Sequence, residues 1–254
     1  MKVICAGIPK TGTKTMAEAL RILGYNVHDV FQQFFYQKEL WSKILANKAT
    51  IKDYQRVLAD VDAVTDVPAC GLWEQISEAF PDAKVILMVR SSEDEWYQSI
   101  KYHFKHMSNL NYNILLYPVF NLILGPLHRE FLYYLSSFLP GSLGTIYTWG
   151  QEVEVLLRSR YRQHNMYVKA TCPKEKLLVF NVKEGWKPLC EFLGVEKPNV
   201  PFPIENVKTK IVDDVAKGQF EHDCGYHRTV VRQVFTRVVF LVGILLALLF
   251  FLIF

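Results

Sequence analysis

The chain has 254 residues, half of them apolar, and its 29 Lys and Arg against 25 Asp and Glu give a formal net charge of +4. This length and apolar content exclude a disordered chain and allow one α/β domain with an appendage. The small, dispersed positive charge gives no reason to expect nucleic-acid binding.

The first predicted element is a buried parallel strand at residues 2–8, KVICAGI. Because this strand would start at Lys2, we expect no signal peptide or transit sequence before it. The five cysteines lack C-x-x-C spacing and a paired histidine motif, which favours a reduced domain without structural zinc. Together these features favour a domain that faces the cytosol.

A glycine-rich loop, GIPKTGTKT, follows this strand. Gly7 and Gly12 have the spacing of a Walker A loop, G-x-x-x-x-G-K-[ST], but a threonine stands where its lysine belongs. Lys14 comes one place late, and Lys10 lies two places before the second glycine. The segment TKTMAEALRIL then predicts a helix that ends at Gly24. A strand, a glycine loop and a helix N-terminus in this order predict a phosphate-binding loop.

Later apolar runs continue the alternation of strands and helices. Strands are predicted at residues 62–68, 83–90 and 176–182, and a short helix at 183–194. This order predicts an α/β, three-layer P-loop fold with a central parallel sheet flanked by helices and ligands at the carboxyl ends of its strands.

Residues 110–148 are apolar and aromatic but are interrupted by three prolines, so no part of this segment is long enough to span a membrane. Two interpretations remain open. The segment forms a pair of core helices, or it forms an apolar lid over an acceptor pocket that reaches the bilayer surface.

The C-terminal residues 238–254 contain no charge and no strong polar group. As a helix they would be about 25 Å long, slightly short for a bilayer core, which predicts a transmembrane helix; the alternative is a buried core helix. A catalytic domain at 1–225 and a basic linker at 226–237 would precede it. Three arginines, Arg228, Arg232 and Arg237, lie in that linker. The positive-inside rule then predicts a single-pass membrane protein whose domain faces the cytosol.

The strand ends argue against a magnesium-dependent NTPase or kinase. Such enzymes hold the metal with an acid that ends a hydrophobic strand. Here VILMV is followed by Arg90, and LLVF by Asn181.

Several motifs resemble those of sulfotransferases that use 3′-phosphoadenosine 5′-phosphosulfate (PAPS). Pro9-Lys10-Thr11-Gly12-Thr13 resembles their P-K-S-G-T loop, and MVRSSEDEWYQS at 88–99 resembles their second signature, an arginine at a strand end followed by a helical serine. TDVP at 65–68 is similar to their T-H-L-P turn, and VKEGWKPLCEFLGV to a divergent invertebrate and microbial branch. The resemblance covers residues 1–210.

The resemblance implies PAPS as co-substrate, a reaction without metal and a small-molecule or lipid acceptor. A lysine ahead of the second glycine can reach the bridging oxygen, where charge grows as the S–O bond breaks. Lys10 is our catalytic candidate for that role, against the alternative of a solvated loop charge. The cofactor-binding candidates in the loop are Pro9, Lys10, Thr11, Gly12, Thr13, Lys14 and Thr15.

The 3′-phosphate of PAPS needs a second cationic site, and Arg90 offers a guanidinium suited to phosphate. A capping-box pattern at residues 92–95 predicts a helix start that carries Ser99, the second candidate contact, about two turns on. The arginine-to-serine spacing is one residue shorter in the cytosolic relatives, so this assignment can shift. The alternative for Arg90 is an ion pair with Glu93 or Asp94.

Asp66 stands where the T-H-L-P motif has its histidine, and a carboxylate there can act as general base. The alternative is an aspartate that caps a turn. His28 and His103 are reserve candidates for the base. The family's adenine-stacking tryptophan is missing after the loop, which leaves Trp186 or the segment after Asn206 to hold the adenine.

Three functions remain open. The first is a membrane-tethered sulfotransferase that acts on a hydroxyl of a small, apolar acceptor. The second is a nucleotide or small-molecule kinase that uses Lys14, and the third is a non-catalytic, membrane-anchored nucleotide-binding protein.

Overall fold

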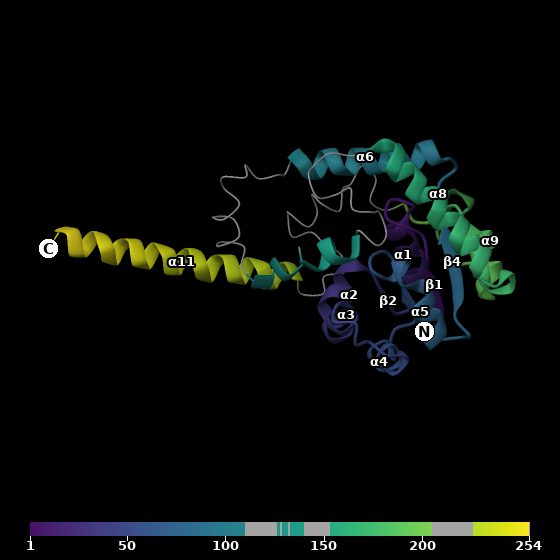
Figure 1. The fold of residues 1–254 in the computed structure, drawn as a ribbon, viewed down its shortest axis with the longest axis horizontal. Coiled ribbons are helices and arrows are strands. Elements are labelled where there is room, and N and C mark those ends of the chain that lie inside the picture. Colours follow the sequence, from purple (N-terminus) through teal and green to yellow (C-terminus); the bar gives the residue numbers. More distant parts are fainter. Residues whose placement is uncertain (110–125, 128, 132, 140–152, 205–225, 254) are drawn as a thin grey trace.

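The structure is a computed structural model that describes residues 1–109, 126–127, 129–131, 133–139, 153–204 and 226–253. In these residues five parallel strands form one sheet in the order β2-β3-β1-β4-β5 (Figure 1). The strands are β1 (Val3–Cys5), β2 (Val27–His28), β3 (Ala63–Val64), β4 (Lys84–Met88) and β5 (Leu177–Phe180). Because the strands are parallel, the loops after β1, β3 and β4 open at the same edge of the sheet.

Helices flank this sheet, which confirms the predicted α/β class. They are α1 (Thr13–Ile22), α2 (Val30–Tyr36), α3 (Lys38–Leu45), α4 (Ile51–Val57), α5 (Trp73–Ala79), α6 (Glu93–Asn109), α8 (Glu154–Thr171), α9 (Trp186–Leu193) and α11 (Tyr226–Ile253). Helix α1 ends before Gly24, whose φ is +86°. Helix α9 covers most of the range 183–194, where the sequence predicted a helix.

Alternate residues of the central strands pack on opposite faces of the sheet. Val3 and Cys5 belong to the core cluster that α1 and α9 cover, whereas Ile4 belongs to the cluster that α4 and α5 cover. Each of these three side chains is fully buried. A sheet covered on both faces explains why its strands are continuous apolar runs rather than alternating ones.

Some of the described residues of 110–148 contribute to the core. Phe131, Tyr134 and Phe138 are buried in one cluster with Phe34 of α2 and Trp41 of α3. The burial of these three residues favours the core interpretation for this part of the segment. The rest of the predicted lid lies outside the described residues.

Helix α11 runs unbroken through the predicted linker and the apolar segment, and Figure 1 shows it projecting away from the sheet. From Val238 onward every side chain that the structure describes is exposed, including Phe240 at 67%. The segment Arg228–Leu248 is long and apolar enough to cross a membrane, and none of its most apolar window is buried. The core-helix interpretation is therefore wrong for the described residues of this segment.

Candidate active site

The glycine-rich motif, residues 7–15, lies at the carboxyl edge of the sheet: residues 7–12 form the loop between β1 and α1, and residues 13–15 form the first turn of α1. A Cβ on Gly7 would lie 2.8 Å from the Cβ of Met88, which is closer than side-chain carbons approach. Gly12 has a φ of +103°, and a Cβ on it would lie 2.6 Å from Val182 Cγ1. Both glycines therefore let the loop pack tightly against the ends of β4 and β5.

Helix α1 starts directly after the loop, with Gly12 as its N-cap. No side chain caps this end, and the first turn carries no acidic residue. The first N–H groups of a helix have no partner within the helix and carry partial positive charge. This end of α1 can therefore hold an anion through its backbone.

The hydroxyls of the loop are already engaged. Thr11 Oγ1 donates to the carbonyl oxygen of Ile8 at 2.7 Å, and Thr13 Oγ1 donates to Asp66 Oδ2 at 2.9 Å. Thr11 and Thr13 are buried, as is Thr15. These hydroxyls help to fix the shape of the loop, and the backbone N–H groups at the start of α1 can serve a ligand instead.

Lys14 joins the loop to two carboxylates. Its Nζ donates to Asp29 Oδ2 and lies 3.6 Å from Asp66 Oδ2. All three side chains are largely buried, at 12%, 4% and 13% exposure. Asp29 also caps helix α2, where its Oδ1 accepts the N–H of Val30 at 2.6 Å. Lys14 is thus held by protein carboxylates rather than left open for the phosphate contact that the kinase hypothesis assigns to it.

Asp66 lies just after β3 and faces the glycine loop. Its backbone is left-handed, with φ +68°, a conformation that aspartate adopts more readily than most residues. Its Oδ1 accepts the N–H of Val67 at 2.9 Å, while its Oδ2 accepts the Thr13 hydroxyl. The turn-capping bond is therefore present, and it leaves the second oxygen directed at the loop.

Lys10 is half-buried in the loop, with φ +72°. Burial lowers its pKa from 10.5 to about 8, because an ammonium is less stable away from water. Asp66 opposes this shift, whereas Arg90 and Lys14 lower the pKa of Lys10 further. Lys10 therefore lies close to one carboxylate and two cations, and it is not a solvated loop charge.

Arg90 follows β4 and braces the loop from the other side. Its Nε donates to the carbonyl oxygen of Lys10 at 2.8 Å, and its Nη1 lies 3.4 Å from Glu95 Oε1. The alternative interpretation of Arg90, an ion pair with Glu93 or Asp94, is wrong in its partner, since Glu95 is the carboxylate that Arg90 contacts.

Glu93 and Asp94 instead pair with arginines of α8. Glu93 contacts Arg162 at 2.7 Å, and Asp94 contacts Arg158 at 2.7 Å. The predicted helix start is present, because Ser92 Oγ accepts the N–H of Glu95 at 3.0 Å. Ser99 lies on the same helix, α6, and is half-buried. No hydrogen bond joins Ser99 to Arg90, both of which the structure describes.

Sequence reasoning missed the residues of α6 and α8 that hold the loop backbone. Trp96 Nε1 donates to the carbonyl oxygen of Pro9 at 3.0 Å, and the Trp96 ring stacks on Tyr161 at 4.6 Å. The Tyr161 hydroxyl accepts the N–H of Arg90 at 3.0 Å. His164 Nε2 bonds the carbonyl oxygen of Ala6 at 2.7 Å.

Lys183 is a further cation that the motifs did not indicate. Its Nζ lies 2.9 Å from Glu95 Oε2 and 3.2 Å from Ser91 Oγ, and Asn181 Nδ2 donates to the same hydroxyl at 3.0 Å. These residues follow β4 and β5, and their side chains are accessible to solvent. They place a second lysine beside Arg90 at the edge of the site.

The reserve histidines and the predicted adenine contact have other surroundings. Burial lowers the pKa of His28 to about 4, and its Nδ1 is bonded to Gln37 Nε2 at 2.9 Å. His103 lies on α6, beside the ring of Phe104. Trp186 is 4% exposed and its Nε1 donates to the carbonyl oxygen of Val200, so its ring belongs to the core rather than to an open adenine site. The segment after Asn206 lies outside the described residues.

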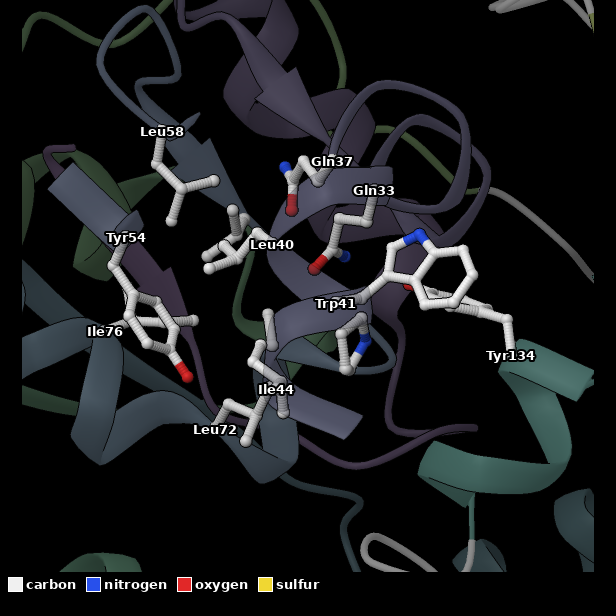
Figure 2. Close-up of a pocket in the computed structure, with 13 residues that line it drawn as sticks. Gln33, Gln37, Leu40, Trp41, Ile44, Tyr54, Leu58, Leu72, Ile76 and Tyr134 are labelled. Atoms are coloured by element: carbon white, nitrogen blue, oxygen red, sulfur yellow. The ribbon is translucent and has the colours of Figure 1, made fainter. Parts of the chain in front are cut away.

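A small cavity is lined in part by Pro68, which follows Asp66 and Val67 along the chain. Figure 2 shows Gln33 and Gln37 on one side of it and Trp41 and Tyr134 on another. Its volume is about 10 Å³, room for about one water molecule. This cavity is therefore a packing gap and not an acceptor pocket.

Comparisons with known proteins place this geometry in context. Residues 2–211 match the family model described as a sulfotransferase domain. The chain is 27% identical over 224 residues to the "Ava biosynthesis cluster protein M" of Aspergillus versicolor, which covers 80% of each protein. In the described residues no group of three or more His, Cys, Asp and Glu is placed to hold a metal ion.

Proposed function

The chain belongs to the sulfotransferase domain family, and from this premise we propose that it transfers a sulfuryl group from PAPS to a hydroxyl of a small, apolar acceptor. The observation that supports this proposal best is the half-buried Lys10, whose lowered pKa comes from burial and from two neighbouring cations. Lys10, Lys14 and Arg90 lie close enough to repel one another at the start of a helix, and a bound polyanion would relieve this repulsion.

The proposed reaction is an in-line displacement at sulfur. The acceptor oxygen attacks the sulfur as the bond from sulfur to the bridging oxygen breaks, and the electron pair stays on the departing 5′-phosphate. Lys10 stabilises the charge that grows on this oxygen, which is a contact stronger in the transition state than in the ground state. The N–H groups at the start of α1 hold the same phosphate.

Asp66 is the proposed general base. Its Oδ2 lies at the loop and takes the proton of the acceptor hydroxyl, whereas its Oδ1 is fixed by the N–H of Val67. Thr13 donates to the same Oδ2 at 2.9 Å and so orients the carboxylate. None of these roles involves a metal.

Arg90 and Ser99 are proposed to contact the 3′-phosphate. Arg90 already uses Nε to bond the carbonyl oxygen of Lys10 and Nη1 to contact Glu95. The remaining N–H groups of its guanidinium would contact the phosphate. Lys183 lies on the same carboxylate and can add a second cation.

Ligand-dependent stability tests the proposed nucleotide. We expect 3′-phosphoadenosine 5′-phosphate (PAP) at a hundred times its dissociation constant to stabilise the chain by about 2.7 kcal/mol in thermal unfolding. ATP with magnesium is the matched control and should stabilise it far less. Equal or greater stabilisation by magnesium-ATP would favour the kinase hypothesis instead.

Turnover needs its own experiment, because a non-catalytic relative would also bind PAP. Lipid and metabolite extracts would be incubated with labelled PAPS and the chain, and sulfated products identified by mass spectrometry. We expect label in apolar products that carry a hydroxyl, and the Lys10→Met variant serves as control. A complete lack of labelled product would support the binding-protein hypothesis.

We also propose that α11 anchors the chain in a membrane as a single span, with the domain on the cytosolic side. From Val238 onward every described side chain of α11 is exposed, and an apolar helix surface of this kind needs a non-aqueous surrounding. The full chain should stay in the membrane fraction after carbonate extraction, whereas a chain that ends at Arg237 should be released. A released full chain would overturn the anchor.

A further inference from the structure

The first turns of α11 carry a polar stripe on one helical face. Its residues follow one another at intervals of three and one, which brings them onto the same side of a helix. They are Thr229, Arg232, Gln233, Thr236 and Arg237. The stripe ends where the exposed apolar part of α11 begins, at Val238.

This polar stripe faces the domain rather than solvent alone. Thr229, Gln233 and Arg237 are half-buried, and the neighbouring Val230 packs against the aromatic cluster of Phe131 and Tyr134. Figure 1 shows this end of α11 beside α2. The position of the stripe is therefore set by helix packing.

A hollow of about 360 Å³ lies between the stripe and Pro126. This volume is in the range that holds a small polar molecule. Arg232 and Arg237 are among the residues that line the hollow, and guanidinium is the side-chain group best matched to phosphate. The hollow is therefore suited to an anion.

The hollow also offers a hydrogen-bond acceptor. The side-chain oxygen Oε1 of Gln233 is buried and has no hydrogen-bond partner in the described part of the chain. A buried acceptor without a donor is costly, so a ligand that brings a hydroxyl or an ammonium would satisfy it.

We propose that this hollow binds the headgroup of an anionic phospholipid, which combines a phosphate diester with a hydroxyl or ammonium donor. The inference rests on the proposed membrane anchor, because the hollow then lies at the level of the headgroups, directly beside the start of the apolar segment. Arg232 and Arg237 hold the phosphate, and Gln233 accepts the headgroup donor.

The test uses the full chain in a neutral detergent and follows its thermal unfolding with soluble, dioctanoyl lipids. Phosphatidylinositol, which has charge and hydroxyls, should raise the unfolding temperature most. Phosphatidic acid and inorganic phosphate should raise it less, and phosphatidylcholine should leave it unchanged. An equal shift with phosphatidylcholine would overturn the headgroup site, and an equal shift with inorganic phosphate would show a plain anion site.

Variants of the stripe separate its two functions. Arg232→Gln should weaken phosphatidylinositol binding by at least about tenfold, the loss expected for one charge-assisted contact. Gln233→Leu should remove the preference for phosphatidylinositol over phosphatidic acid. Arg228→Gln is the matched control, with the same charge change one turn earlier and outside the hollow, and should bind as the unchanged chain does.

Unchanged binding in both stripe variants would overturn the proposal. PAP-dependent stabilisation, measured in the same samples, reports that each variant is folded. Because binding in detergent does not depend on membrane insertion, failure of the anchor in carbonate extraction and failure of the headgroup site are separate outcomes.

Discussion

The side of the glycine loop that faces β3 and the side that faces β4 use different interactions. Toward β3 the contacts are between side chains, with Asp66 and Asp29 arranged around Lys14 and Thr13. Toward β4 the side chains of Trp96 and Arg90 bond to loop carbonyl oxygens.

This difference separates two physical tasks. The β3 side places charge at the site, and its changes should appear in the rate of the reaction. The β4 side determines the path of the loop backbone, and its changes should appear in stability and nucleotide affinity. Variants on the two sides can therefore be compared directly.

The largest effect on rate is expected from Asp66→Asn. The amide cannot accept the acceptor proton, so single-turnover transfer with saturating PAPS should slow by about 10²–10⁴-fold. Asp29→Asn is the matched control, since Asp29 contacts the same Lys14 but caps α2 instead of facing the acceptor. If both variants slow transfer equally, Asp66 acts through Lys14 and is not the base.

The next effect is expected from Lys10→Met, which removes the ammonium but keeps a long side chain. Loss of one group that stabilises transition-state charge should lower kcat by about 10²–10³-fold. Lys183→Met, which removes a lysine that is 60% exposed at the same edge of the site, should lower kcat far less. Comparable losses in the two variants would show that only the total positive charge matters.

The pH dependence of the unchanged chain offers a smaller and more specific test. Lys10 must carry its proton to stabilise the leaving group, and its pKa in the free chain is about 8. We therefore expect kcat/KM to level off just below this value and to fall about tenfold per pH unit above it. Lys10→Met should lack this alkaline limb. A limb that persists in the variant would belong to another group.

Much of the β3 side could be predicted from the sequence, and little of the β4 side could. The strand before the loop and the one that ends at Arg90 are continuous apolar runs, which place Lys10 and Arg90 at strand ends, and Asp66 lies in the TDVP motif that ends a third predicted strand. Asp29 has a local signal that was missed, the D-x-x-Q capping box before α2.

Strand β2, which brings Asp29 to the site, has only two residues and shows no periodicity. The braces of the β4 side are far from the loop in sequence. Tyr161 is 71 residues from Arg90, and His164 is 158 residues from Ala6. Both lie on α8, where an aromatic residue and a histidine on a buried helix face are typical of an ordinary core. Only packing of α8 against α6 gives them their contacts with the loop.

The smallest effect on rate is expected from Trp96→Phe, which keeps the aromatic ring on Tyr161 but removes the N–H that bonds Pro9. The buried carbonyl oxygen then lacks its donor, which should lower the free energy of unfolding by about 1–3 kcal/mol in urea. Trp41→Phe is the matched control, because its Nε1 donates to the carbonyl oxygen of Phe34 within the core.

Both tryptophan variants should lose similar stability, but only Trp96→Phe should also weaken PAP binding, since only its bond holds the loop. Because the charges around Lys10 stay in place, kcat with saturating PAPS should be nearly unchanged in both. A large loss of kcat in Trp96→Phe would mean that the path of the loop and the placement of its charge are one property, and the two sides of the loop would no longer be separable.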